Sequence, residues 1–230
     1  MHDEKMEILL HLDRQLTNFW KGLYDIKKIN SIMDRALQRV KNNFFYIAAD
    51  RYWNEEKKLI FSVTDTSLWS VFLYIVSNEL YHAGCIEEAS VVYYLNKMMH
   101  SVEWFYAVDL PEIFMVEHPI GSVLGRAKYG NKLLVYQGVT VGGSKRNGDI
   151  CYPVIGENVT LFANSTVLGD SIIGDDVIVS SGTYIINEKI PNNCIVFGKS
   201  PNLTIVKKNK EAIKEYTIHV WKGNEKNENL

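Results

Sequence analysis

A histidine beside a carboxylate is the pair of residues in this sequence best suited to acid–base chemistry. Residues 117–121 read Glu-His-Pro-Ile-Gly, and His118 is the only histidine between residues 108 and 206. An alcohol is a weak nucleophile at neutral pH, and histidine, with an ordinary pKa of about 6.5, can remove its proton. A nearby carboxylate can fix the imidazole tautomer, and backbone N–H groups can stabilise an oxyanion. His118 is therefore our candidate for a general base.

The composition conceals two halves of different construction. The chain has 230 residues, 15 of them glycine, and a formal net charge of -2. Only two glycines fall within residues 1–107, whereas twelve glycines and all five prolines fall within residues 108–208. Such a charge balance argues against a broadly basic nucleic-acid binder, so we expect no nucleic-acid partner. Glycine costs up to about 1 kcal/mol relative to alanine in a helix, so the glycine-poor half is the candidate for helices.

Hydrophobic periodicity and helix-capping residues together predict four helices in the first half. Residues 5–21 and 24–41 place apolar side chains at spacings of three, four and seven, which form one stripe on a helix. Two further helices are expected over 68–83 and from 86 to about 102. Residues 42–63 contain two aromatic patches and little periodicity, so this interval is left unassigned.

The second half repeats every six residues. Aliphatic residues occupy six consecutive positions at this spacing, namely Ile155, Leu161, Val167, Ile173, Val179 and Ile185. A period of six fits neither an α-helix nor a simple strand, and hexapeptide repeats are typical of a parallel β-helix whose three-sided coils stack. We predict an α+β chain with an all-α N-terminal domain (1–107), a β-helix domain (108–206) and a C-terminal helical, flexible tail (207–230).

One loop interrupts the repeat. Val141 and Ile155 are 14 residues apart, where two hexads would give 12, and the excess lies in residues 144–153. Loops that escape a rigid scaffold tend to carry function. We therefore expect this loop to contribute to a site.

These features together resemble the serine acetyltransferase family. Residues 139–143 (Val-Thr-Val-Gly-Gly) resemble the coil before that family's extended loop, and residues 117–118 resemble its acidic-His catalytic segment. Residues 152–155 (Tyr-Pro-Val-Ile) stand where the family has His-Pro-Lys-Ile, and residues 197–201 resemble its closing Gly-x-Pro turn. The resemblance covers about residues 108–206. It implies a left-handed β-helix, a homotrimer or dimer of trimers, acetyl-CoA as donor, a small hydroxyl acceptor and no metal.

The resemblance also implies roles for individual residues. His118 would be the base, and either Asp109 or Glu117 would orient it, although Asp109 is about one hexad closer to His118 than the family pattern expects. The acceptor would contact Glu117, Cys151 and Tyr152. The coenzyme would contact Gly143, Ser144, Ala163, Ser181, Gly198 and Lys199.

The chain departs from the family at the residues that hold the acceptor. The family's loop has an Arg-His pair there, and this chain has Cys151 and Tyr152. Neither carries a positive charge, so a bidentate clamp for a carboxylate is missing. The acceptor therefore stays open between L-serine and a sugar or nucleotide-linked sugar.

Two other functions remain as alternatives. A β-helical carbonic anhydrase needs a zinc site of three histidines, and a single histidine in the repeat argues against it. A non-catalytic scaffold or regulatory binding protein would keep the solenoid without the chemistry.

The cysteines and the apolar segments bear on localisation. The chain has three cysteines, and an odd, sparse count favours a reducing compartment. No signal peptide is recognisable, and no apolar run approaches the roughly 20 residues of a membrane span. We expect a cytoplasmic protein.

Overall fold

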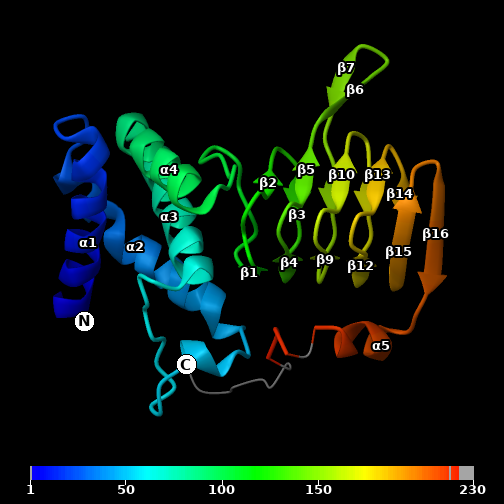
Figure 1. Cartoon of the computed structure of the whole chain (residues 1–230), viewed down its shortest axis with the longest axis horizontal. Helices are drawn as coiled ribbons and strands as arrows, with labels where there is room; N and C mark the ends of the chain where they lie inside the picture. Colours follow the sequence, from blue (N-terminus) through cyan, green and yellow to red (C-terminus); the bar gives the residue numbers. More distant parts are fainter. Residues whose placement is uncertain (1, 218, 223–230) are drawn as a thin grey trace.

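The amino-terminal half of the protein folds into four α-helices and one short 3₁₀ helix. The computed structural model describes residues 2–217 and 219–222, and Figure 1 shows the helices at one end of the molecule. The four helices confirm those predicted from the sequence. The unassigned interval 42–63 contains the end of α2 and the 3₁₀ turn. Their bounds are α1 His2–Trp20, α2 Ile26–Phe45, η1 Asp50–Tyr52, α3 Thr66–His82 and α4 Ile86–His100.

Helix α3 is the centre of this half. Nearly all of its residues are buried, as expected for a helix that is apolar on all sides. It begins at Asp65, whose carboxylate accepts a hydrogen bond from the Leu68 N–H at 2.8 Å. It ends at His82, just before Gly84, which adopts a φ of 77°. Its burial between α2 and α4 gives the half a core rich in large aromatic side chains.

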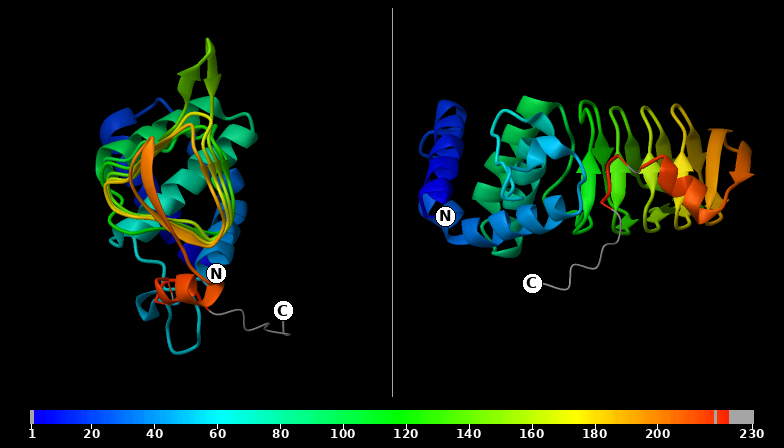
Figure 2. Two further views of the ribbon diagram at one scale, coloured as in Figure 1. Left: turned by 90° about the vertical axis from the view of Figure 1, so that its right-hand side faces the viewer. Right: turned by 90° about the horizontal axis from the view of Figure 1, so that it is seen from below.

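The second half is a left-handed parallel β-helix of about five turns, which confirms the predicted fold class. Successive coils add one short strand to each of three sides, so that the cross-section is a triangle (Figure 2). The first side contains β1 Phe114–Val116, β4 Leu133–Val135, β9 Thr160–Leu161, β12 Val177–Val179 and β15 Cys194–Lys199. The second contains β2 Val123–Leu124, β5 Thr140–Gly142, β10 Thr166–Leu168 and β13 Tyr184–Ile186. The third contains β3 Lys128–Tyr129, β8 Val154–Ile155, β11 Ile172–Ile173 and β14 Lys189–Ile190.

The six-residue period is the period of inward-facing side chains. All six aliphatic positions from residue 155 to residue 185 are at most 2% exposed. The coils are held in register by parallel pairing, in which Val167 pairs with Val141 on one side and with Ile185 on the other. One continuous aliphatic column therefore runs through the solenoid.

The loop that interrupts the repeat is a β-hairpin. Its strands are β6 Ser144–Arg146 and β7 Asp149–Cys151, paired antiparallel. Asn147 and Gly148 join them with φ values of 51° and 96°, as a two-residue hairpin turn requires. The hairpin projects away from the solenoid (Figures 1 and 2).

The end of the described chain returns to the helices. After β15, a turn with a cis Ser200–Pro201 bond leads into the antiparallel strand β16 Asn202–Lys207 and then α5 Lys210–Glu215. We call residues 209–217 and 219–222 the C-terminal strap. It runs back along the solenoid on the side opposite the hairpin (Figure 1).

The strap is joined to the segment after α2. The Ala48 N–H donates to the Val220 carbonyl at 2.8 Å, and the Lys222 N–H donates to the Tyr46 carbonyl at 2.9 Å. The part of the predicted flexible tail beyond residue 222 lies outside the described residues. Within the described part of the chain, no helix has the length and apolar character needed to cross a membrane.

Candidate functional site

His118 lies at the first turn of the solenoid, directly after β1. Its side chain is exposed and its φ is 52°, in the left-handed region that few non-glycine residues adopt. Within residues 2–217 and 219–222, no side chain hydrogen-bonds its imidazole. Strained backbone of this kind often occurs at functional sites. An exposed imidazole with an unengaged ring is accessible to a ligand.

Glu117 faces the helical half. It is half-buried, and its Oε1 accepts a hydrogen bond from Arg51 Nη2 at 3.3 Å. Its backbone N–H donates to the Val135 carbonyl at 2.9 Å, which anchors the turn on the next coil. The carboxylate is therefore directed to an arginine rather than to the His118 ring.

Asp109 is engaged by helix α3. Its Oδ1 accepts a hydrogen bond from Asn78 Nδ2 at 3.0 Å and lies 2.8 Å from His82 Nε2. Burial acts to raise the pKa of Asp109, but the hydrogen bonds from Asn78 and His82 outweigh it and lower that pKa. The structure thus places neither proposed orienting carboxylate on the His118 ring within one chain.

His118 shares one edge of the solenoid with two of the residues assigned to the coenzyme. We call this edge the His118 corner, made of the turns 117–122, 136–139, 162–165 and 180–183. Ala163 and Ser181 lie in its later turns, and the coils are joined there by hydrogen bonds such as Gly182 N–H to the Ala163 carbonyl at 2.9 Å. Ser181 is exposed and Ala163 is half-buried.

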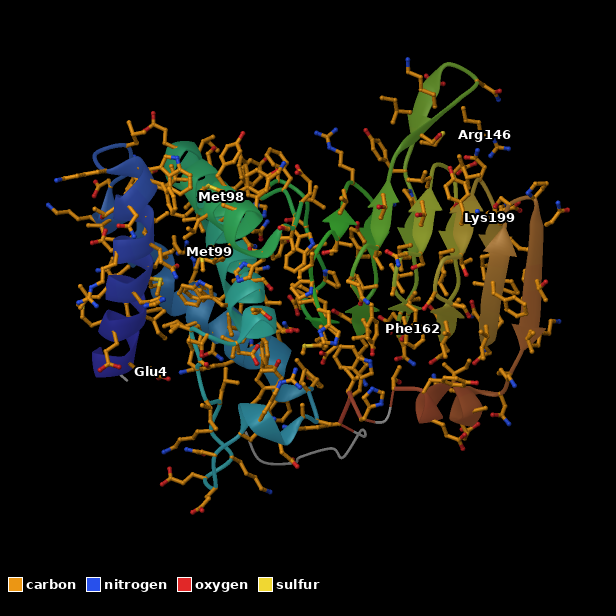
Figure 3. All side chains as sticks on the ribbon, in the orientation of Figure 1. Glu4, Met98, Met99, Arg146, Phe162 and Lys199 are labelled. Carbon is orange, nitrogen blue, oxygen red and sulfur yellow. The ribbon has the colours of Figure 1, made fainter. Side chains whose placement is uncertain are left out.

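Two aromatic residues of the same corner were not singled out from the sequence. Tyr136 and Phe162 stack with ring centroids 5.0 Å apart and planes 28° apart. Burial, and to a lesser extent the charge of Glu117, raise the pKa of Tyr136. Phe162 is labelled among the side chains in Figure 3. Both residues directly follow a strand of the first side, in successive coils, and this equivalence in the repeat could have predicted that their rings stack.

The hairpin gathers four other predicted site residues at a second edge. We call this the hairpin corner, made of the turns 125–127, 143–153, 169–171 and 187–188. Ser144 pairs with Cys151 across the hairpin, and the Tyr152 ring lies against Gly143. A Cβ atom on Gly143 would stand 2.8 Å from Tyr152 Cε1 and 3.0 Å from Ile150 Cγ2, so a side chain there would displace these two side chains.

The hairpin carries its own charges. Arg146, the last residue of hairpin strand β6 (labelled in Figure 3), donates from Nη1 to Asp170 Oδ2 at 2.7 Å. Tyr152 is 39% exposed and Cys151 is half-buried. The side chains that replace the family's acceptor-binding pair therefore remain accessible and uncharged at the base of the hairpin.

Gly198 and Lys199 lie at the end of the last coil. Both are in β15 and exposed, and Lys199 stands in register with Tyr184 of β13. Gly198 has a φ of 100° at the approach to the turn into β16. Lys199 is labelled at that end of the solenoid in Figure 3.

The two corners are too far apart for one chain to close a site between them. One side of the triangle is about six residues, or roughly 15–20 Å. A side chain cannot bridge that length, so His118 and Tyr152 do not meet within a single chain. In the described residues, no group of three or more His, Cys, Asp or Glu side chains is arranged to hold a metal ion.

The chain is similar in sequence to bacterial hexapeptide-repeat transferases and to serine acetyltransferases. Residues 152–187 match the family model described as bacterial transferase hexapeptide (six repeats). The serine acetyltransferase of Synechococcus elongatus is 31% identical over 106 residues, which are 46% of this chain and 43% of that protein. The match thus spans less than two thirds of the curated relative.

Solved structures share the fold. The Neisseria gonorrhoeae serine acetyltransferase superposes with a TM-score of 0.68 at 20% identity, covering 90% of this chain and 81% of that one. A serine acetyltransferase in complex with CoA superposes with a TM-score of 0.62 at 17% identity, covering 84% and 81%. The repeat, the curated relatives and the shared fold make this chain similar to serine acetyltransferases and to other hexapeptide-repeat proteins.

Proposed function

We propose that this chain is an acetyl-CoA-dependent O-acetyltransferase in which His118 is the general base. One observation carries the proposal: the sole histidine of residues 108–206 stands exposed, at a φ of 52°, on the same solenoid edge as Ala163 and Ser181. The relatives' established name, serine acetyltransferase, supports the reaction class. Residues 108–206 would form the catalytic domain.

The proposed reaction needs one proton carrier. His118 removes the proton of the acceptor hydroxyl while its oxygen attacks the carbonyl carbon of the thioester. A C–O bond forms, and the tetrahedral oxyanion then collapses with cleavage of the C–S bond. The imidazolium returns its proton to the departing thiolate of coenzyme A, so that base and acid are the same residue.

The proposed donor site uses the small residues of both corners. Gly143, Ser144, Ala163 and Ser181 would leave room for the pantetheine arm, and Gly198 with Lys199 would lie near its outer end. The similar structure in complex with CoA supports this donor. Because the corners do not meet in one chain, we propose a homotrimer or dimer of trimers, in which the hairpin corner of one chain lies beside the His118 corner of another.

The acceptor is proposed to be a small hydroxyl compound in the cytoplasm. The relatives' name supports L-serine. The uncharged Cys151 and Tyr152 fit the hydroxyl groups of a sugar or nucleotide-linked sugar, which have no carboxylate to clamp. Glu117 would contact the acceptor beside the base.

A thiol-release assay tests the proposal. The full chain is incubated with acetyl-CoA and, separately, L-serine, homoserine or a panel of nucleotide-linked sugars, and free coenzyme A is measured. We expect release with one acceptor class above the rate without acceptor. Release with none of them contradicts the proposed function.

The second candidate is a non-catalytic scaffold or regulatory binding protein. It is favoured by one observation, that neither Asp109 nor Glu117 contacts the His118 ring within the described chain. Calorimetric binding of acetyl-CoA without thiol release on any acceptor would support it. Turnover on any acceptor rules it out.

A further inference from the structure

The segment between α2 and α3 places Arg51 next to Glu117 of the candidate site. This segment showed no periodicity, and its 3₁₀ turn carries Arg51. Tyr52 is 1% exposed, and its ring packs edge-on against Phe44 with centroids 4.9 Å apart. Trp53 Nε1 donates to the Ile47 carbonyl at 3.0 Å. The backbone that carries Arg51 is therefore fixed in the core and by hydrogen bonds.

Three partners hold the guanidinium of Arg51. Nη2 donates to the Tyr52 hydroxyl at 2.8 Å and to Glu117 Oε1 at 3.3 Å. Nε lies 3.5 Å from Asp65 Oδ2, at the start of α3. The planar fork of arginine suits several acceptors at once, which a lysine ammonium on its flexible stem does not reproduce.

The turn that contains His118 is held mainly by its backbone. The Gly121 N–H donates to the Ser101 carbonyl at 2.9 Å, and the Gly138 N–H donates to the Ile120 carbonyl at 2.9 Å. At His118 itself φ is 52°, a conformation that persists only where the surroundings determine it. Two side chains also act on the turn: Ser122 Oγ donates to the Pro119 carbonyl at 2.7 Å, and the Glu117 carboxylate, next to His118, accepts from Arg51 at 3.3 Å.

We propose that Arg51 is a positioning residue for His118. It holds the Glu117 carboxylate on the side of the helices and so fixes the turn that presents the imidazole, in place of a carboxylate bonded directly to the ring. This inference rests on the proposed function and deepens it, because it assigns part of the site to the helical half.

The first test compares three variants of the full chain in the thiol-release assay. Arg51→Met removes the contact with Glu117. Arg51→Lys keeps the positive charge but lacks the planar guanidinium. Arg35→Met is the control. Arg35 forms a similar half-exposed pair with Glu79, with Nε 3.1 Å from Oε2, between α2 and α3.

We expect Arg51→Met to lower kcat by about 10- to 100-fold and to change the KM for acetyl-CoA less than twofold, as for a misplaced catalytic group. Arg51→Lys should recover part of that loss, and Arg35→Met should leave kcat unchanged. Combining Arg51→Met with Glu117→Gln should cost no more than the larger single effect, since the two residues act as a unit. An unchanged kcat in Arg51→Met, or fully additive losses, overturns the inference.

The second test does not depend on activity. The histidine ring signals of the full chain are recorded by NMR, and the His118 signal is identified by its loss in His118→Ala. We expect Arg51→Met to shift or broaden the His118 signal and Arg35→Met to leave it unchanged. An unchanged His118 signal in a folded Arg51→Met protein contradicts the positioning role even if no acceptor is found. A shifted signal in a protein without turnover keeps the positioning role and rejects the proposed function.

Discussion

The helical half and the solenoid bury their side chains by different rules. In the helices, the core consists of large aromatic and aliphatic groups whose partners often come from distant parts of the sequence, as where the Trp69 ring of α3 lies edge-on to His11 of α1 with centroids 5.3 Å apart. In the solenoid, each inward residue stacks on residues of the coils before and after it, as Val167 does on Val141 and Ile185. The solenoid thus gives a straight, repetitive frame, whereas the helical half can place single side chains such as Arg51 at one point of that frame.

The largest expected difference concerns a leucine in each core. Leu161 and Leu12 are both fully buried. Substitution of either leucine by alanine lowers the free energy of unfolding by about 2–5 kcal/mol. The loss is larger where the surrounding residues cannot move in to fill the cavity. Because ladder bonds fix the coils on three sides, we expect Leu161→Ala to lie at the upper end of that range and Leu12→Ala at the lower end. Denaturant unfolding at a fixed protein concentration measures both, and a larger loss for Leu12→Ala would reverse the comparison.

The second largest difference is expected between a glycine of the solenoid and a glycine of the helical half. A Cβ on Gly130 would stand 2.5 Å from the Gly156 carbonyl oxygen of the next coil, so coil stacking itself forbids a side chain. Gly84 has open space around it and a φ of 77°, so alanine there meets only backbone strain of about 1–2 kcal/mol. We expect Gly130→Ala to lower Tm more than Gly84→Ala. Equal Tm values would show that the coils can move apart easily.

The structure shows why these two halves differed in how far they could be predicted. The solenoid was predictable because its period is written in adjacent hexads, and the inward positions are those expected from residue 155 onward. The contact between Arg51 and Glu117 spans 66 residues and depends on how the helices pack, so no local pattern records it. Asp109 is close to His118 in sequence, yet it pairs with Asn78 and His82, because α3 packs against the segment that precedes β1.

The pH dependence of stability tests the helical core. His100 is 6% exposed, and burial lowers its pKa to about 4. The unfolded chain, with an ordinary pKa of about 6.5, binds the extra proton first, so between pH 6.5 and 4 the free energy of unfolding falls as pH falls. The slope from this group reaches about 1.4 kcal/mol per pH unit. His100→Gln should flatten the profile in this window.

The exposed His82 serves as the control for that experiment. We expect His82→Gln to leave the larger part of the slope between pH 6.5 and 4 in place. If His100→Gln left the profile unchanged, the buried histidine would not be the source of acid sensitivity in the helices.

The smallest expected effect concerns the hairpin, which stands outside the stacked coils. Arg146 and Asp170 form an ion pair at 2.7 Å, with side chains 47% and 53% exposed. Exposed pairs of this kind contribute about 0.2–1 kcal/mol. Arg146→Ala should therefore change Tm about as little as Lys145→Ala on the same strand. A drop as large as that of Gly130→Ala would mean that the hairpin supports the solenoid itself.

The most direct measurement is the rate of coenzyme A release by His118→Ala on whichever acceptor the full chain turns over. A general base contributes typically about 10²–10⁴-fold, so we predict a loss of kcat in that range with an unchanged melting temperature. Full turnover by folded His118→Ala would contradict the central claim that the histidine at the first turn of the solenoid performs the chemistry.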